Sequence, residues 1–175
     1  LPQGFFPDMD YDQLYIEYKL PEGTNSTQVG EDLHAIENYL LGRSEITHVT
    51  TSIGGTPSRY NLVRSIADPS LAYGELIVDY TSPEALTASF DEIQTYLNAN
   101  YPDAYVRLKR YNLMYKKFPI EVEFSGPDPA VLRDLTAQAA AIMEESPSLQ
   151  MVTSEWEPKV PVPVSYTHLT LPTIL

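Results

Sequence analysis

The chain has 175 residues, of which 43% are hydrophobic and none is cysteine, and its formal net charge is −13. This length can hold one ordinary domain, or one small domain and part of a second, with enough apolar residues for a core. The negative charge argues against nucleic acid or an anionic membrane as partner, because both would be repelled at long range. The absence of cysteine excludes disulfides, thiolate metal sites and cysteine nucleophiles.

The first part of the chain alternates between strand and helix patterns. Residues 14–20 alternate apolar and polar side chains, which predicts a half-buried strand. A turn at 21–23 ends this strand, and a polar cap at 24–26 begins a helix that runs to about Leu41, with Gly42 as its stop. The β-branched segment 46–52 predicts a second strand, which ends at the glycine-containing break 54–57.

The same pattern then repeats and completes one subdomain. Residues 73–80 predict a third strand, Ser82 and Pro83 begin a helix that runs to about Asn98, and residues 104–112 predict a fourth strand. The order βαββαβ predicts an α+β fold of the ferredoxin-like, split βαβ type. In that fold an antiparallel sheet carries two helices on one face.

A third copy of the pattern begins after this subdomain and lacks a partner. Residues 120–124 predict a fifth strand, a third helix follows the turn at 125–129, and residues 149–155 predict a sixth strand. This half unit, βαβ, is the expected opening of a second ferredoxin-like subdomain. All three helices carry an apolar stripe at closely related spacing: Val29, Leu33, Ile36 and Leu40; Leu86, Phe90, Ile93 and Leu97; and Leu132, Leu135, Ala139 and Ile142.

The end of the chain does not follow the strand and helix pattern. Residues 164–173 resemble the conceptual translation of a transposase adapter that is used to prepare DNA sequencing libraries. We therefore expect residues 164–175 to be an adapter-derived artefact and leave them out of the fold prediction.

No motif in the chain predicts catalysis, a metal or a cofactor. Asp8, Asp10 and Asp12 have the spacing that opens a calcium loop, but Gln13 and Lys19 occupy the positions that need glycine and glutamate. The histidines have no carboxylate at ligand or triad spacing. We expect no catalytic residue, no metal and no cofactor.

The fourth strand and the residues after it carry a basic and aromatic stretch that raises RNA binding as an alternative. RNA-recognition domains also place exposed aromatic residues on a βαββαβ sheet. The glycine-containing RNP1 pattern is absent, however, and the chain is strongly acidic. We therefore expect an exposed strand that pairs with acidic neighbours in a larger assembly. The residues concerned are Tyr105, Arg107, Lys109, Arg110, Tyr111, Tyr115, Lys116 and Lys117.

Two segments resemble inner-membrane transporters of the resistance-nodulation-division (RND) family. Residues 1–8 (LPQGFFPD), followed by a strand that ends in LPEGT at 20–24, resemble the segment just outside a transmembrane helix of these transporters. Residues 124–129 (FSGPDP) with Leu132 resemble the start of the family's next porter subdomain. The likeness covers the chain to about Pro163. It implies a lead-in at 1–7, a first porter subdomain at 8–113, a connector at 114–117 and a partial second porter subdomain at 118–163.

This resemblance implies a function in transport rather than an enzyme. RND transporters are proton-driven efflux pumps that export hydrophobic or amphiphilic compounds, and each works as a homotrimer with a periplasmic adaptor and an outer-membrane channel. The segment would lie on the periplasmic side of the cell inner membrane, with the rest of the transporter chain as a partner. It would form part of the substrate path, while proton coupling would stay in the transmembrane helices.

The glycine-containing break is the expected place of the substrate path. It lies where porter domains of the second half of these transporters carry a flexible loop beside the deep drug pocket, so the resemblance favours the second half. The phenylalanine-rich, repeated-glycine loop of the best-known multidrug members is absent. The candidate residues for the substrate path are Ile53, Gly54, Gly55, Thr56, Pro57 and Tyr60.

Two other functions remain open, because a ferredoxin-like fold does not determine function. The chain could be a free-standing ferredoxin-like regulatory module that binds a small molecule. It could also be an enzyme built on the same fold.

Overall fold

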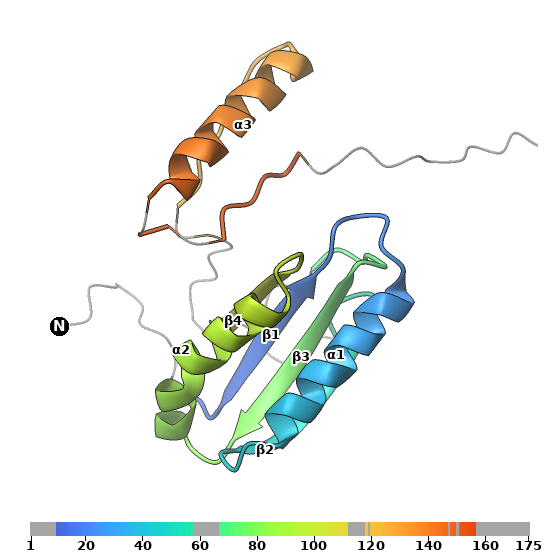
Figure 1. Cartoon of the computed structure of the whole chain (residues 1–175), viewed down its shortest axis with the longest axis vertical. Coiled ribbons are helices and arrows are strands. Elements are labelled where there is room, and N and C mark those ends of the chain that lie inside the picture. The colour runs from blue at the N-terminus through green and yellow to red at the C-terminus, as the bar shows by residue number, and fades with distance from the viewer. Residues whose placement is uncertain are drawn as a thin grey trace, which may run out of the picture.

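The structure, a computed structural model, describes residues 10–57, 67–111, 118, 120–146, 148–149 and 151–156. The lead-in 1–7, the connector 114–117 and the tail 164–175 lie outside these residues. Figure 1 shows the elements in chain order: β1 (Gln13–Lys19), α1 (Ser26–Leu41), β2 (Ile46–Ile53), β3 (Tyr73–Tyr80), α2 (Pro83–Asn100), β4 (Tyr105–Arg110) and α3 (Pro129–Glu144).

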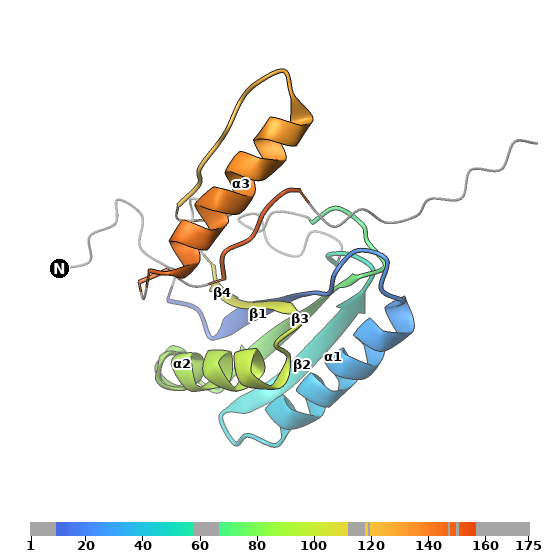
Figure 2. The same cartoon turned by 45° about the horizontal axis from the view of Figure 1, so that its top comes forward.

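The four strands form one antiparallel sheet with the order β2-β3-β1-β4. Strand β1 is central, so that Ile16 lies opposite Leu76 of β3 and Leu108 of β4. Helix α1 packs against β2 and β3, and α2 packs mainly against β4. Both helices cover the same face of the sheet, as the two views in Figures 1 and 2 show. The predicted α+β, ferredoxin-like fold is confirmed. We call β1 to β4 with α1 and α2 the sheet subdomain.

The core of the sheet subdomain lies between the sheet and the two helices. Alternate residues of each strand point toward the helices, and the apolar stripes of α1 and α2 meet them, as the predicted periodicity requires. The α1 stripe is fully buried; Phe90 in the α2 stripe is partly buried, and the other three residues are fully buried. Among the largest buried side chains are Leu14, Ile16, Tyr18, Leu33, Ile36, Leu40, Leu76, Leu86, Ile93 and Leu97.

The helices of the sheet subdomain begin where the sequence predicts caps. The Asn25 side chain accepts a hydrogen bond from the backbone nitrogen of Thr27 at 3.0 Å, which satisfies a donor at the start of α1. Ser82 does the same for Ala85 at 3.2 Å, and Pro83 occupies the first turn of α2. Gly42 ends α1, as predicted.

Gly74 of β3 allows α1 to lie close to the sheet. A Cβ atom at this position would overlap Cδ1 of Leu33 and would lie 3.2 Å from Cγ1 of Val29. It would also lie 3.1 Å from the backbone oxygen of Ser52 on the neighbouring strand. Glycine is therefore required here by the helix-to-sheet distance, and its backbone conformation is ordinary.

The third helix forms as predicted, but the two strands predicted beside it do not. Asp128 caps α3 by accepting a hydrogen bond from the backbone nitrogen of Ala130 at 2.8 Å. The described residues of 120–124 and 149–155 form no strand, so these two predictions are wrong. A strand needs a neighbour for its backbone hydrogen bonds, and no described segment pairs with either one. The helix, whose hydrogen bonds are internal, needs none.

The apolar stripe of α3 is only partly covered. No residue of α3 is buried. Several large apolar side chains are exposed on and beside the helix, namely Ile120, Val122, Phe124, Val131, Leu135 and Ile142.

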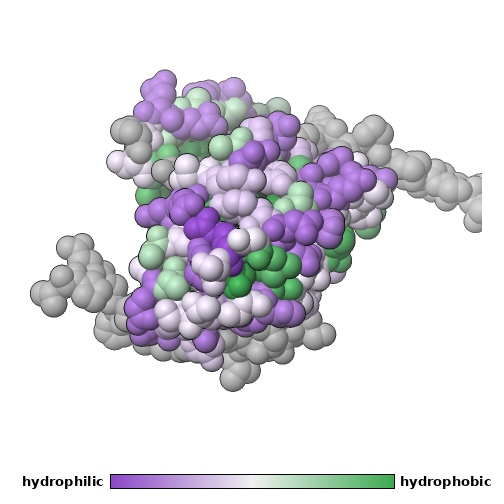
Figure 3. All heavy atoms as spheres, turned by 60° about the horizontal axis from the view of Figure 1, so that its bottom comes forward, coloured by the Kyte–Doolittle hydropathy of each residue, from purple (hydrophilic) through white to green (hydrophobic). Residues whose placement is uncertain are grey.

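The face of the molecule in Figure 3 is in contrast mostly hydrophilic, which agrees with the large negative charge. Within the described part of the chain, no helix combines the length and the apolar character that a bilayer crossing requires.

Candidate functional site

The base of the connection between β2 and β3 holds five of the six predicted substrate-path residues. Ile53 ends β2, and residues 54–57 follow it. Gly54 has a φ of 85°, a left-handed conformation that favours glycine. Its nitrogen donates to the Tyr73 oxygen at 2.8 Å, and its oxygen accepts from the Ser70 nitrogen at 3.2 Å. These bonds join the start and the end of the connection. Tyr60, the sixth candidate, lies outside the described residues.

Thr56 connects this loop base to a buried carboxylate. Its hydroxyl donates to Oε2 of Glu75 at 3.2 Å and accepts from the backbone nitrogen of Ala67 at 2.9 Å. Glu75 is fully buried in β3, and the Tyr73 hydroxyl donates to the same Oε2 atom at 2.8 Å. A buried carboxylate needs such donors, because its removal from water is otherwise costly. The loop base is therefore tied to the sheet through Glu75.

Glu75 belongs to a row of charged residues on the sheet face opposite the helices. It lies across from Glu17 of β1, and Glu17 lies across from Arg107 of β4. Lys109 Nζ lies 3.2 Å from Oε2 of Glu17, and the two side chains are only 8% and 12% exposed. Strand β4 thus places positive charge beside Glu17 of β1, its neighbour in the sheet.

This arrangement corrects one expectation about β4. The basic, aromatic stretch was predicted to be exposed, but Lys109 is buried beside Glu17 of the same chain. Tyr111 is also buried, and its hydroxyl donates to Oε1 of Gln13 at 2.8 Å. Lys109 thus pairs with an acidic residue of its own chain, and pairing within a larger assembly stays a prediction. The predicted exposure is wrong for these two residues because they pack on the sheet face itself.

A hollow adjoins the loop base. It has a volume of about 370 Å³ and lies between the turn after β1 and the residues just before β3. Ser70 links its two sides, because the Ser70 hydroxyl donates to Oε1 of Glu22 at 3.0 Å. Two exposed apolar side chains lie in this region of the chain: Leu71, 69% exposed, lines the hollow, and Ile53, 51% exposed, belongs to the loop base. The surface combines apolar and hydrogen-bonding groups, which suits contact with an amphiphilic compound. The described residues contain no cluster of three metal-binding side chains.

Glu75, which links the loop base to the sheet, is not among the residues predicted from the sequence. A signal for it does exist in the sequence. Residues 73–80 read YGELIVDY, in which Glu75 is a charged residue inside a mostly apolar strand. Such a residue in a central strand requires buried partners, and Thr56 and Tyr73 supply hydrogen bonds. The partners themselves could not be identified without the strand register.

Replacing Thr56 by valine tests the link between the loop base and the sheet. We expect the free energy of unfolding to fall by about 1–2 kcal/mol, because Glu75 loses a donor and the Ala67 nitrogen loses its acceptor. Urea denaturation followed by circular dichroism measures the loss. Thr56→Ser keeps the hydroxyl and should retain most of the stability. An equal loss in both variants would show that the methyl group matters and the hydrogen bonds do not.

Comparisons with known proteins do not place the chain in a family. No family model matches it, and no curated protein matches it. Among solved structures, the chain is similar to the crystal structure of protein SO0527 from Shewanella oneidensis. The match has 10% sequence identity and a TM-score of 0.40, and it covers 61% of this chain and 95% of the other. A similarity at this level indicates neither a shared family nor a shared function.

Proposed function

We propose that this chain is a periplasmic porter piece of an RND efflux transporter that exports hydrophobic or amphiphilic compounds. The observation that carries the proposal is the contrast between a complete subdomain and a helix that has no buried residue. The sheet subdomain buries the stripes of α1 and α2, whereas α3 has a similar stripe and buries no residue. A helix of this kind normally buries its apolar face against another element. The residues that would cover α3 belong, in this proposal, to the rest of the transporter.

The loop base would be the contribution of this piece to the substrate path. Two subdomains that move against each other can open and close a cleft without bond chemistry. A loop at such a cleft has to be anchored if it is to move with its subdomain. The hydrogen bond from Thr56 to Glu75 and the backbone bonds of Gly54 provide this anchor. Ile53 and Leu71 supply exposed apolar surface for an amphiphilic compound.

The alternative of a free-standing regulatory module has one observation in its favour. The sheet subdomain has a closed core of its own, as a small-molecule-binding ferredoxin-like module would need. That alternative leaves the exposed apolar surface of α3 and residues 120–124 without explanation. An unexplained apolar surface of this kind normally marks an interface. We therefore favour the transporter.

The DNA that flanks the coding segment gives the first test. Long-read sequencing of the locus should show a transmembrane segment that ends immediately before Leu1 and a docking insertion after Pro163. The codons for residues 164–175 should be absent from the genome. A start codon near Leu1 together with a stop codon near Pro163 would refute the transporter and favour the free-standing module.

The recovered full-length gene then permits a transport assay. Cells that lack their own efflux pumps would express the gene and be loaded with a hydrophobic fluorescent dye. We expect Ile53→Asp to raise the dye that the cells retain, because a charge would replace apolar surface of the proposed path. Leu41 is a matched control, since it is 48% exposed and ends α1, away from the loop base. Equal effects of Ile53→Asp and Leu41→Asp would argue against a path at the loop base.

A further inference from the structure

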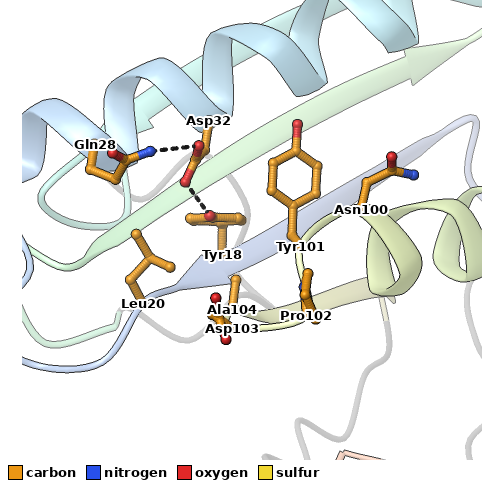
Figure 4. A pocket seen from close by; sticks show the side chains of 9 residues that line it. All are labelled: Tyr18, Leu20, Gln28, Asp32, Asn100, Tyr101, Pro102, Asp103 and Ala104. Carbon is orange, nitrogen blue, oxygen red and sulfur yellow. Dashed lines mark hydrogen bonds between the residues drawn. The ribbon is translucent and has the colours of Figure 1, made fainter.

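A second hollow lies on the helix side of the sheet subdomain. It has a volume of about 310 Å³ and lies between α1 and the turn from α2 into β4. Figure 4 shows Tyr18 of β1 beneath Asp32 of α1, with Tyr101 beside it at the end of α2. The turn residues Pro102 and Asp103 form another part of the wall.

The hollow brings two aromatic rings and two carboxylates together. The rings of Tyr18 and Tyr101 meet edge to face, with centroids 5.9 Å apart and an interplanar angle of 87°. Asp32 accepts hydrogen bonds from the Tyr18 hydroxyl at 2.6 Å and from the Gln28 side chain at 2.9 Å. These donors hold the Asp32 carboxylate in place at the hollow, as the dashed lines in Figure 4 show. Asp103 lies on the other wall.

No basic residue of the described chain neutralises these carboxylates. The described ion pairs join Lys19 to Glu22, Arg43 to Glu45 and Glu92, and Lys109 to Glu17, all elsewhere. The environment of Tyr18 reflects the negative charge. Burial raises its pKa most, and the hydrogen bond to Asp32 and the charges of Asp32 and Asp103 raise it further. Tyr18 therefore stays protonated and continues to donate to Asp32.

We propose that this hollow binds a small organic cation, such as an ammonium or guanidinium group carried on a compact apolar body. The carboxylates of Asp32 and Asp103 would attract the charge, and the Tyr101 ring would contribute a cation–π interaction. Leu20 and Pro102 offer apolar surface to the body of the ligand. A bare Ca²⁺ or Mg²⁺ ion fits less well, since each prefers six or more oxygen ligands and the described residues contain no cluster of three metal-binding side chains. Anions are disfavoured by both carboxylates.

This inference does not depend on the proposed transport function. It concerns a surface that the chain itself forms, and it can be tested on the isolated chain. Benzylammonium is a suitable probe, and benzyl alcohol is its neutral counterpart of similar shape. Titration of the ¹⁵N-labelled chain with each compound, followed by two-dimensional NMR, reports binding at individual backbone amides.

We expect benzylammonium to cause saturable shifts that concentrate at residues 28–32 and 100–104, and benzyl alcohol to cause much smaller ones. Asp32→Asn should weaken binding about tenfold, because the amide keeps an acceptor for Tyr18 but loses the charge. Asp103→Asn should weaken binding in the same direction, and this exposed residue can be changed with little risk to the fold. Tyr101→Leu should weaken binding about threefold.

Asp91→Asn provides the charge-matched control, since Asp91 is exposed on α2 and does not line the hollow. This variant should bind benzylammonium as the unchanged chain does. Equal shifts with benzyl alcohol would overturn the proposal, because the charge would then be irrelevant. Equal weakening by Asp91→Asn and Asp103→Asn would also overturn it, since long-range attraction to an acidic surface would explain the binding.

Discussion

Replacing Gly74 by alanine is expected to lower the free energy of unfolding by about 1–3 kcal/mol, although alanine usually favours the folded chain over glycine. The added Cβ atom would overlap Leu33 Cδ1 and crowd Val29, and both side chains are fully buried in α1. The third neighbour is the backbone oxygen of Ser52, which cannot rotate away. Relief therefore requires both a shift of α1 away from the sheet and a small displacement of the β2 backbone at Ser52. Urea denaturation followed by circular dichroism measures the loss.

Gly55→Ala is the control for this prediction, because its nearest atom to an added Cβ lies 4.0 Å away. This variant should keep the stability of the unchanged chain to within about 0.5 kcal/mol. A double-mutant cycle with Leu33→Ala separates the contact from other effects. If the overlap with Leu33 is the cause, the combined loss will be smaller than the sum of the two single losses. Additive losses would show that the contacts with Ser52 and Val29 dominate.

Replacing Lys109 by methionine is expected to lower the free energy of unfolding by about 3 kcal/mol. The substitution keeps most of the side chain's length but removes its positive charge from beside Glu17. Both side chains are largely buried, so water screens their interaction poorly. Glu17 also lies across from buried Glu75, and loss of the lysine increases the repulsion between these two carboxylates. Urea denaturation gives the change in free energy.

Lys19→Met is the matched control, since Lys19 is in the same sheet and pairs with Glu22 at 3.4 Å. Both partners are 35% exposed, and the loss should be below about 1 kcal/mol. In the double variant Glu17→Gln with Lys109→Met, part of the stability should return, because position 17 then carries no buried charge that has lost its lysine partner. Similar losses from Lys109→Met and Lys19→Met would mean that burial adds little to the ion pair.

The sheet subdomain could be predicted from the sequence because its patterns are local. The period-two alternation of 14–20 and the stripe at Val29, Leu33 and Ile36 each identify an element and its buried face. The caps at Asn25 and Ser82 are local too, because each side chain bonds to a backbone nitrogen two or three positions along the chain. The strand predictions at 120–124 and 149–155 were wrong because a strand depends on a partner that is not local in sequence. Alternation indicates that a segment is able to pair, but pairing needs a neighbour that the described chain does not contain.

The polar groups of both sites come together through contacts between distant elements, which the sequence alone does not provide. Thr56 and Glu75 are 19 positions apart, and their contact follows from the pairing of β2 with β3. The burial of Lys109 depends on Glu17, 92 positions away. The hollow at Tyr18 joins the middle of the sheet to the end of α2. The composition indicates an acidic surface. It does not indicate that Asp32 and Asp103 lie in one hollow with the rings of Tyr18 and Tyr101.

The central position of β1 has a consequence for the order in which the sheet can close. Tyr111, just after β4, bonds to Gln13 of β1 across 98 positions of sequence. A chain that emerges from the ribosome can pair β1 with β3 first, but one edge of β1 then stays open until β4 follows. Open edges invite pairing with other chains, and distant pairings slow folding. The last strand of the subdomain is therefore the one that protects the first, and truncation before Tyr105 would leave an aggregation-prone sheet.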